Sequence, residues 1–284
     1  MEGPLSKGKE TFFDTACRLG EPPASPNADV FDYRGDRPRG SDDSAHPRLA
    51  EQAVGEAEDV RELLGKNPAL AQGSEIVFTK NSPLHIAGNR DVAEILLDAG
   101  ASIDATDVMG LTPLHTAKRA EIVDLLIERG ANVNHPGDIG ATPLHMAVFP
   151  DVALALLRNG ADINAMSRTR GTPLFSQTMD NRFSVIRQLL DKGADTSLPN
   201  AADGRTPLHL AAAIGATDVL ELLLRHGARM ETLDQTGGTP LVSAVRADRI
   251  FTARALIGHG AKTSAARRFA GSPEMKRVFA RTQK

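Results

Sequence analysis

Four histidines stand in the same short context along the chain, and histidine suits both metal binding and proton transfer near neutral pH. Each ends a Ser-Pro-Leu-His or Thr-Pro-Leu-His string, and the four are His85, His115, His145 and His209. Two further copies of the string end in Phe175 and Val242, which would be unusual in a set of metal ligands. A zinc ion needs its nitrogens about 2.0–2.1 Å away, whereas packed helices lie about 8–10 Å apart. Histidines one repeat apart therefore cannot share a zinc ion.

Other catalytic signals are missing from the sequence. It contains no HExxH, GxxxxGK[ST] or GxSxG string and no CxxC pair. Cys17 is the single cysteine, so an internal disulfide cannot form. We therefore predict a non-enzymatic protein with no catalytic residue, no cofactor and no metal site.

The strings themselves mark an internal repeat, which must position the histidines. Their start-to-start steps are 30, 30, 30, 34 and 33 residues, and they begin at Ser82, Thr112, Thr142, Thr172, Thr206 and Thr239. A period of this size is typical of a solenoid. In each copy Ser or Thr suits the N-cap of a helix and Pro suits its first position. A second, mostly apolar helix follows and a Gly ends it, so neither helix can bury its apolar face without a neighbouring repeat.

The repeats resemble those of the ankyrin repeat family. The resemblance rests on the Thr-Pro-Leu-His strings and on Leu-Leu-x-x-Gly-Ala near the end of the second helix, at Leu96–Ala101, Leu156–Ala161, Leu189–Ala194 and Leu223–Ala228. It covers roughly Leu49–Thr263. It implies an all-α solenoid of stacked helix–turn–helix units with β-turn fingers, whose concave face of fingers and first helices binds other proteins. It also implies that the string histidine is structural and hydrogen-bonds across the turns.

Two parts of the chain differ in composition. Residues 1–47 are rich in Pro, Gly and charge, so little burial would offset the entropy of ordering them, and we expect a disordered tail. Residues 48–284 are expected to form the ankyrin repeat domain. Its predicted parts are an N-terminal cap at 48–78, six repeats at 79–263 and a C-terminal capping helix at 264–284.

The first three repeats are shorter than the last three. The Gly that ends the second helix lies 18 residues after the start of the string in repeats one to three, and 21 residues after it in repeats four to six. The missing residues fall between the two helices, where Gly215 stands in repeat five. Three residues correspond to about 4.5 Å of helix, so we expect a groove with a short-walled and a full-walled half, meeting near the longer finger Ser197–Arg205. Shared descent of duplicated repeats and a groove shaped for one partner both explain the pattern.

Candidate partner-binding residues are those whose type does not suit a solvated turn. Met109, Leu111 and Ile139 are apolar at finger positions, and Phe149 stands where a first helix should end. Three arginines form a basic group on neighbouring fingers, and Arg is enriched at interface centres. Packing against the next repeat is the alternative for the apolar residues, and simple solvation is the alternative for the arginines. The candidates are Met109, Leu111, Asp138, Ile139, Phe149, Arg168, Arg170, Met179, Arg205 and Gln235.

Charge and composition limit the partners. A net charge of −3 and a pI near 6.2 give no positive electrostatic field that would attract nucleic acid. The sequence contains no run of about 18 apolar residues that could span a membrane. We expect a cytoplasmic protein that is monomeric on its own. An uncleaved secretion signal has the composition of an ordinary polar tail, so delivery into a host cell by a specialised secretion system stays open. The Ala/Arg/Gly-rich, Lys-poor repeats suggest a GC-rich bacterial genome.

The predicted function is protein–protein interaction. The chain would capture another protein on its concave face, as an adaptor, an inhibitor or an injected bacterial effector. The alternative is a structural scaffold subunit in a permanent complex, which a large apolar patch on the convex face would favour.

Deleting residues 1–47 should leave the thermal unfolding midpoint nearly unchanged. The composition break before Leu49 places the whole predicted core after the tail. Circular dichroism melts of the full and shortened chains test this expectation. A drop of many degrees in the shortened chain would show that the tail packs on the repeats.

Overall fold

The computed structural model describes residues 57–72 and 80–280, and every structural statement below concerns these residues. The predicted tail at 1–47 and the first residues of the predicted N-terminal cap lie outside them. The described part contains 13 α-helices, three short 3₁₀ helices and no strand, so the expected all-α fold is confirmed.

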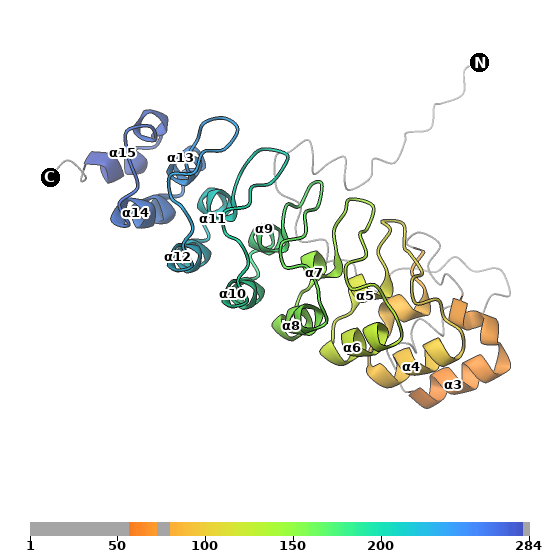
Figure 1. Ribbon diagram of the computed structural model, residues 1–284. Coiled ribbons are helices and arrows are strands. Elements are labelled where there is room, and N and C mark those ends of the chain that lie inside the picture. Colours follow the sequence, from red (N-terminus) through yellow and green to blue (C-terminus); the bar gives the residue numbers. More distant parts are fainter. Residues whose placement is uncertain (1–56, 73–79, 281–284) are drawn as a thin grey trace, which may run out of the picture. The chain divides into compact units, whose positions relative to one another are not determined.

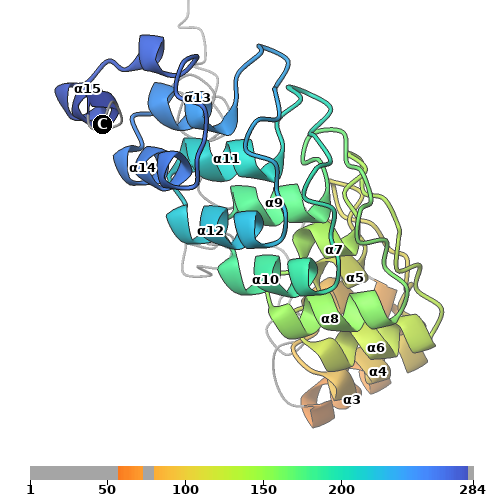
Figure 2. The ribbon, with the colours of Figure 1, turned by 60° about the vertical axis from the view of Figure 1, so that its left-hand side comes forward.

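The helices form two rows (Figures 1 and 2). The inner row follows the Pro-Leu strings and comprises η2 (Pro83–Ile86), α5 (Pro113–Thr116), α7 (Pro143–Met146), α9 (Pro173–Met179), α11 (Pro207–Ile214) and α13 (Pro240–Arg246). The outer row comprises α4 (Arg90–Asp98), α6 (Ala120–Glu128), α8 (Pro150–Arg158), α10 (Phe183–Asp191), α12 (Thr217–Arg225) and α14 (Ile250–Gly258). Before the rows come α3 (Ala57–Lys66) and η1 (Pro68–Gln72), and after them come η3 (Arg267–Phe269) and α15 (Pro273–Ala280).

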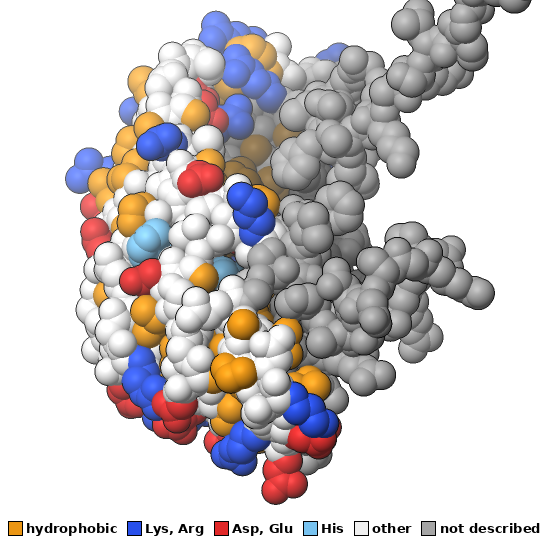
Figure 3. Space-filling model, turned by 90° about the vertical axis from the view of Figure 1, so that its right-hand side faces the viewer, with side chains coloured by type: hydrophobic (Ala, Val, Ile, Leu, Met, Phe, Trp, Pro, Cys, Tyr) orange, Lys and Arg blue, Asp and Glu red, His pale blue; other side chains and the backbone are white. Residues whose placement is uncertain are grey.

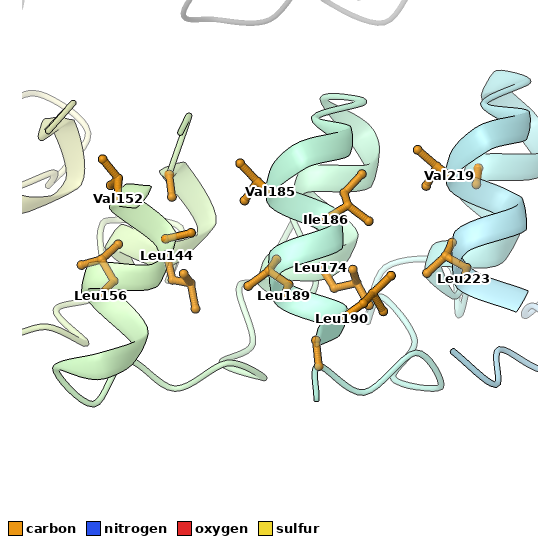
Figure 4. Close-up of a cluster of buried hydrophobic side chains, with 14 of the residues drawn as sticks. Leu144, Val152, Leu156, Leu174, Val185, Ile186, Leu189, Leu190, Val219 and Leu223 are labelled. Atoms are coloured by element: carbon orange, nitrogen blue, oxygen red, sulfur yellow. The ribbon is translucent and has the colours of Figure 1, made fainter. Parts of the chain in front are cut away.

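The core lies between the rows and between successive repeats. Outer helices bury side chains at spacings of one and four residues, as Val185, Ile186 and Leu189 do in α10, while the inner helices contribute residues such as Leu174 (Figure 4). Full burial of each such side chain stabilises the fold by about 1.5–3 kcal/mol. The cluster runs from α3 to α15 without a break, so each repeat is completed by its neighbours.

The three missing residues of the short repeats come from the inner row. All six outer helices have nine residues, but inner helices have four residues in the first three repeats and seven, eight and seven in the last three. The long repeats turn through a residue with positive φ, namely Asn181, Gly215 or Asp248. The short repeats leave the inner helix through an extended alanine, Ala87, Ala117 or Ala147. The expected short and long halves therefore differ by the last turn of the inner helix.

Hairpin-like loops, here called fingers, join each outer helix to the next inner helix. Four fingers close over five residues, as in the bond from the Asp107 N–H to the Leu111 carbonyl at 2.9 Å, and one closes over six, from the Asn200 N–H to the Arg205 carbonyl at 2.8 Å. Backbone hydrogen bonds also join neighbouring fingers, for example Asp138 N–H to Met109 carbonyl at 3.0 Å. Within the described residues no hydrogen bond joins the 167–171 finger to the six-residue finger at 200–205. The ladder of fingers is therefore interrupted at the inserted residue.

The junction between the last short repeat and the first long one uses a buried glutamine. Because α7 has only four residues, its carbonyl groups lack partners within the helix. The Gln177 side-chain N–H₂ group lies 3.0 Å from the His145 carbonyl, 3.0 Å from the Ala147 carbonyl and 3.4 Å from the Leu144 carbonyl. Gln177 is fully buried, so α9 supplies donors that water cannot supply to α7.

Replacing this glutamine should destabilise the stack. Gln177→Leu keeps most of the side-chain volume and removes these donors. Among the described residues, the His145 carbonyl then keeps only the Ser176 hydroxyl at 3.2 Å and the Ala147 carbonyl only the Arg182 guanidinium at 3.5 Å, so the loss should cost about 1–3 kcal/mol. The matched control is Gln188→Leu in α10, whose half-buried amide makes no such bonds and which should change stability by less than about 0.5 kcal/mol. Urea unfolding measures both variants, and equal effects would contradict the capping role of Gln177.

Candidate functional site

The fingers and the inner helices together form one face, here called the finger face. Most of the predicted partner-binding residues are exposed on it or at its edge. Met109 (50 % exposed) and Ile139 (40 % exposed) lie at finger tips, where Asp138, Arg168 and Gln235 are also exposed. Phe149, 44 % exposed, immediately precedes α8, and the exposed Met179 ends α9.

Leu111 was predicted to be exposed, and this prediction is wrong. Its side chain is 5 % exposed. It packs beneath the neighbouring finger, where a Cβ added to Gly137 would lie only 2.8 Å from a Leu111 methyl group. Its carbonyl accepts a hydrogen bond from His85 Nε2. Leu111 therefore belongs to the packing between fingers, which was the alternative weighed for the apolar finger residues.

Arg170 does not form an open basic group with its neighbours. Its side chain is 17 % exposed and its guanidinium lies 3.6 Å from the Asp180 carboxylate and 3.0 Å from the Ser176 hydroxyl. Arg182 approaches the same carboxylate at 3.2 Å. The Arg170 charge is therefore used inside repeat four, because the long α9 places Asp180 beneath the finger.

Arg205 is also partly neutralised. Its guanidinium lies 3.5 Å from Asp203 and 3.9 Å from Asp234. Of the three predicted finger arginines, Arg168 alone makes no ion pair in the described residues. The expected basic group is thus reduced to one open charge.

Sequence reasoning missed several exposed apolar residues. Val108 and Met166 are about half exposed and lie near the tips that carry Met109 and Ile139. The exposed Leu233 directly precedes the 234–238 finger, and Phe251 is exposed on α14. On the surface shown in Figure 3, hydrophobic side chains emerge in small groups, while oppositely charged side chains gather at the lower edge. Val108 and Met109 directly precede Gly110, which has a positive φ. Two apolar residues before a turn glycine could therefore have been recognised in the sequence as a finger tip.

The four string histidines connect successive repeats. In His145, Nδ1 accepts a hydrogen bond from the Thr142 backbone N–H at 3.0 Å, and Nε2 donates to the Gly171 carbonyl of the next finger at 3.0 Å. His85, His115 and His209 make the same pair of bonds. Because Nδ1 accepts from a backbone N–H, the proton is on Nε2 and both ring nitrogens are in use.

Burial of these rings disfavours their charged form. It lowers the pKa of His115 and of His145 to about 4 and lowers the pKa values of His85 and His209. Among the described residues no group of three or more His, Cys, Asp or Glu side chains is placed to hold a metal ion. The arrangement positions helices and fingers, and it leaves no free imidazole lone pair at the strings.

Comparison with known families decides the assignment of the fold. The family described as ankyrin repeats (3 copies) matches residues 84–167 and 174–266, which is more than half of the chain. The chain belongs to the ankyrin repeat family. Among solved structures, the ankyrin repeat domain of human ASB11 has a TM-score of 0.64 and 27 % identity, covering 77 % of this chain and 98 % of that one. The ankyrin repeat domain of Bcl-3 has a TM-score of 0.58 and 25 % identity, covering 78 % and 100 %.

Sequence relatives match only part of this chain and a small part of their own length. Serine/threonine-protein kinase 12 of Arabidopsis thaliana is 40 % identical over 77 residues, which is 27 % of this chain and 17 % of the kinase. The human 2-5A-dependent ribonuclease is 34 % identical over 77 residues, which is 27 % of this chain and 10 % of the ribonuclease. The chain thus spans a small part of these relatives. Ankyrin repeats generally mediate protein–protein interaction and are typically not enzymes. In the described part of this ankyrin repeat chain, no helix is long and apolar enough to cross a membrane.

The ankyrin histidines should make stability depend on pH. An unfolded histidine takes up a proton below its ordinary pKa of about 6.5, whereas folded His115 and His145 resist protonation down to about 4. The stability that these neutral rings contribute is therefore fully present above about pH 6.5 and is lost as the pH falls toward 4. Each ring contributes up to about 1.4 kcal/mol per pH unit in that window.

Removing one ring should reduce this slope. His145→Phe places there the residue type that repeat four buries at Phe175. Urea unfolding between pH 7 and pH 4.5 should show a free energy of unfolding that falls less steeply in the variant, whatever its stability at pH 7. Identical slopes in both proteins would contradict the assignment of His145 as a buried neutral ring.

Proposed function

We propose that the chain is a non-enzymatic adaptor or inhibitor that captures one partner protein on its finger face. The observation that carries this proposal is the exposure of Met109 and Ile139 at the finger tips and of Phe149 in the turn between α7 and α8. Aromatic residues and methionine are enriched in protein interfaces relative to the rest of the surface. A cytoplasmic location, or delivery of the protein into a host cell as a bacterial effector, is part of the same proposal.

The finger tips form a connected surface, which supports the proposal. The Asp138 N–H bonds to the Met109 carbonyl at 3.0 Å, and the Arg168 N–H bonds to the Ile139 carbonyl at 2.9 Å. Three successive tips are therefore held together by their backbones. A surface that is already ordered loses less entropy when it binds.

A step in the inner row adds shape to this surface. Four-residue α7 is followed by seven-residue α9, whose last residue is the exposed Met179. Gln177 bonds the Ala147 carbonyl, so the end of α9 lies beside the turn that leads to Phe149. The two exposed side chains thus flank the change of inner-helix length, where a partner would meet both halves of the groove.

The scaffold alternative has less support. It calls for a broad apolar patch on the outer row, and among the described residues the large exposed apolar side chain that belongs to an outer helix is Phe251 in α14, 77 % exposed. A single exposed side chain is normal on a protein surface.

Substitutions on the finger face should weaken partner capture without unfolding the protein. A pull-down from the native host with mass spectrometry identifies the partner, and titration calorimetry then measures the variants. Met109→Asp, Ile139→Asp and Phe149→Ala should each cost about 2 kcal/mol or more, roughly thirtyfold in affinity. Arg168→Asp should cost less and lose its effect in high salt.

Two outer-row variants are matched controls. Phe251→Ala removes an exposed aromatic ring, and Arg225→Asp reverses an exposed charge that makes no ion pair in the described residues. Both should bind normally. If either control abolishes binding while the finger-face variants bind normally, the partner lies on the outer row and the proposal is wrong.

A further inference from the structure

Charge is distributed unevenly along the chain. Residues 246–280 contain eight Lys or Arg and two Asp or Glu, although the whole chain has 33 Lys or Arg against 36 Asp or Glu. The C-terminal end of the stack is therefore positive, and the rest of the chain carries the compensating negative charge. Such an asymmetry creates a local field that the net charge of −3 conceals.

Arginines in the first repeats are paired across the outer row. Arg90 lies 2.7 Å from Glu128, Arg129 lies 3.0 Å from Glu94, and Arg158 pairs with Asp124. These ion pairs join α4 to α6 and α6 to α8. Positive charges in that part of the chain are thus neutralised by the stacking of the repeats.

Four cations at the C-terminal end have no such partner among the described residues. These four exposed residues, here called the basic patch, make no ion pair with a carboxylate of the described residues: Arg246, Arg267, Arg268 and Lys276. The two nearby acids are already engaged, since Asp248 accepts a hydrogen bond from the Ser272 hydroxyl at 2.6 Å and Glu274 lies 3.7 Å from Arg277.

Aromatic rings hold the guanidinium groups of the patch in place. The guanidinium carbons of Arg246 and Arg268 lie 4.3 Å and 4.7 Å from the centre of the Phe269 ring. Arg267 lies 5.9 Å from the centre of the Phe279 ring and donates to the Phe279 carbonyl at 3.3 Å. Stacking fixes the plane of a guanidinium and leaves N–H groups on its edge for a bidentate acceptor.

A pocket opens within the patch. It is lined by Arg267, Ala270, Lys276, Phe279 and Ala280, with two cations and no acidic side chain. A carboxylate entering this pocket would meet both cations. Carboxylates and phosphates share this recognition chemistry, so the choice between them depends on the surroundings.

We propose that the basic patch binds an acidic segment of the partner protein, as a second contact beside the finger face. A nucleic acid fits less well, because Arg side chains cover the Phe269 ring that a base would stack on, and the remainder of the chain is negative and would repel a long polyanion. This inference rests on the proposed function, since the acidic segment belongs to the captured protein.

Binding of model peptides to the full chain tests the patch independently of the partner. Fluorescence anisotropy should detect binding of a labelled twelve-residue polyglutamate peptide that weakens with added salt. The double variant Arg268→Glu, Lys276→Glu should weaken this binding at least tenfold. The matched control Arg225→Glu, Lys192→Glu makes the same charge change at exposed outer-row positions and should bind nearly as the unchanged protein does.

Three results would overturn the inference. The first is that the peptide does not bind at all, and the second is that the patch and control variants lose peptide binding equally. The third is that a labelled twelve-nucleotide oligothymidine binds more tightly than the peptide and loses its binding in the patch variant, which would make the patch a nucleic-acid site. None of these results bears on the finger face, which the partner titrations test separately.

Discussion

Burial of outer-helix side chains between neighbouring repeats is the interaction on which the rest of the structure depends. An isolated nine-residue helix with valine, isoleucine and leucine on one stripe has no stable partner within its own repeat, because the inner helix covers only part of that stripe. The stack therefore forms a continuous core from α3 to α15. Conservation of outer-helix length at nine residues, while inner helices vary from four to eight, follows from this dependence.

Shortening an inner helix has a structural consequence in the next repeat. A four-residue helix exposes nearly all its carbonyls, and in a buried junction these need donors from outside. The Thr116 hydroxyl donates to the His85 carbonyl at 2.7 Å. The Ser176 hydroxyl and the Gln177 amide donate to the carbonyls at the end of α7. Burial of Ser176 and Gln177 in α9 is thus explained by the helix before it, whereas the buried Thr178 hydroxyl bonds to the Leu174 carbonyl of its own helix.

The repeat pattern made the fold predictable from the sequence. The exposure of individual site residues was less predictable, because it depends on side-chain contacts between different elements. The shared Ser/Thr-Pro-Leu string predicts the start of each inner helix, because an N-cap and a first-position proline act locally. Leu111 and Arg170 were misjudged because their surroundings come from elsewhere, Leu111 from the next finger and Arg170 from the end of a longer α9. The basic patch could not be predicted from the sequence, because it depends on the stacking of arginines on Phe269 and on the lack of ion pairs among the described residues nearby.

Residues that stack the repeats and residues available to a partner belong to different sets. The string histidines, Leu111 and Gln177 are buried in contacts between repeats, so changing them alters stability before it alters recognition. Met109, Ile139 and Phe149 are exposed on elements that those contacts hold in place. Each repeat is stabilised by core contacts with its neighbours, and the finger tips contribute little to that core. The residues at the tips can therefore vary with little effect on stability. No hydrogen bond joins the 167–171 finger to the 200–205 finger among the described residues. At this one place in the described ladder, the fingers before the gap could shift relative to the fingers after it.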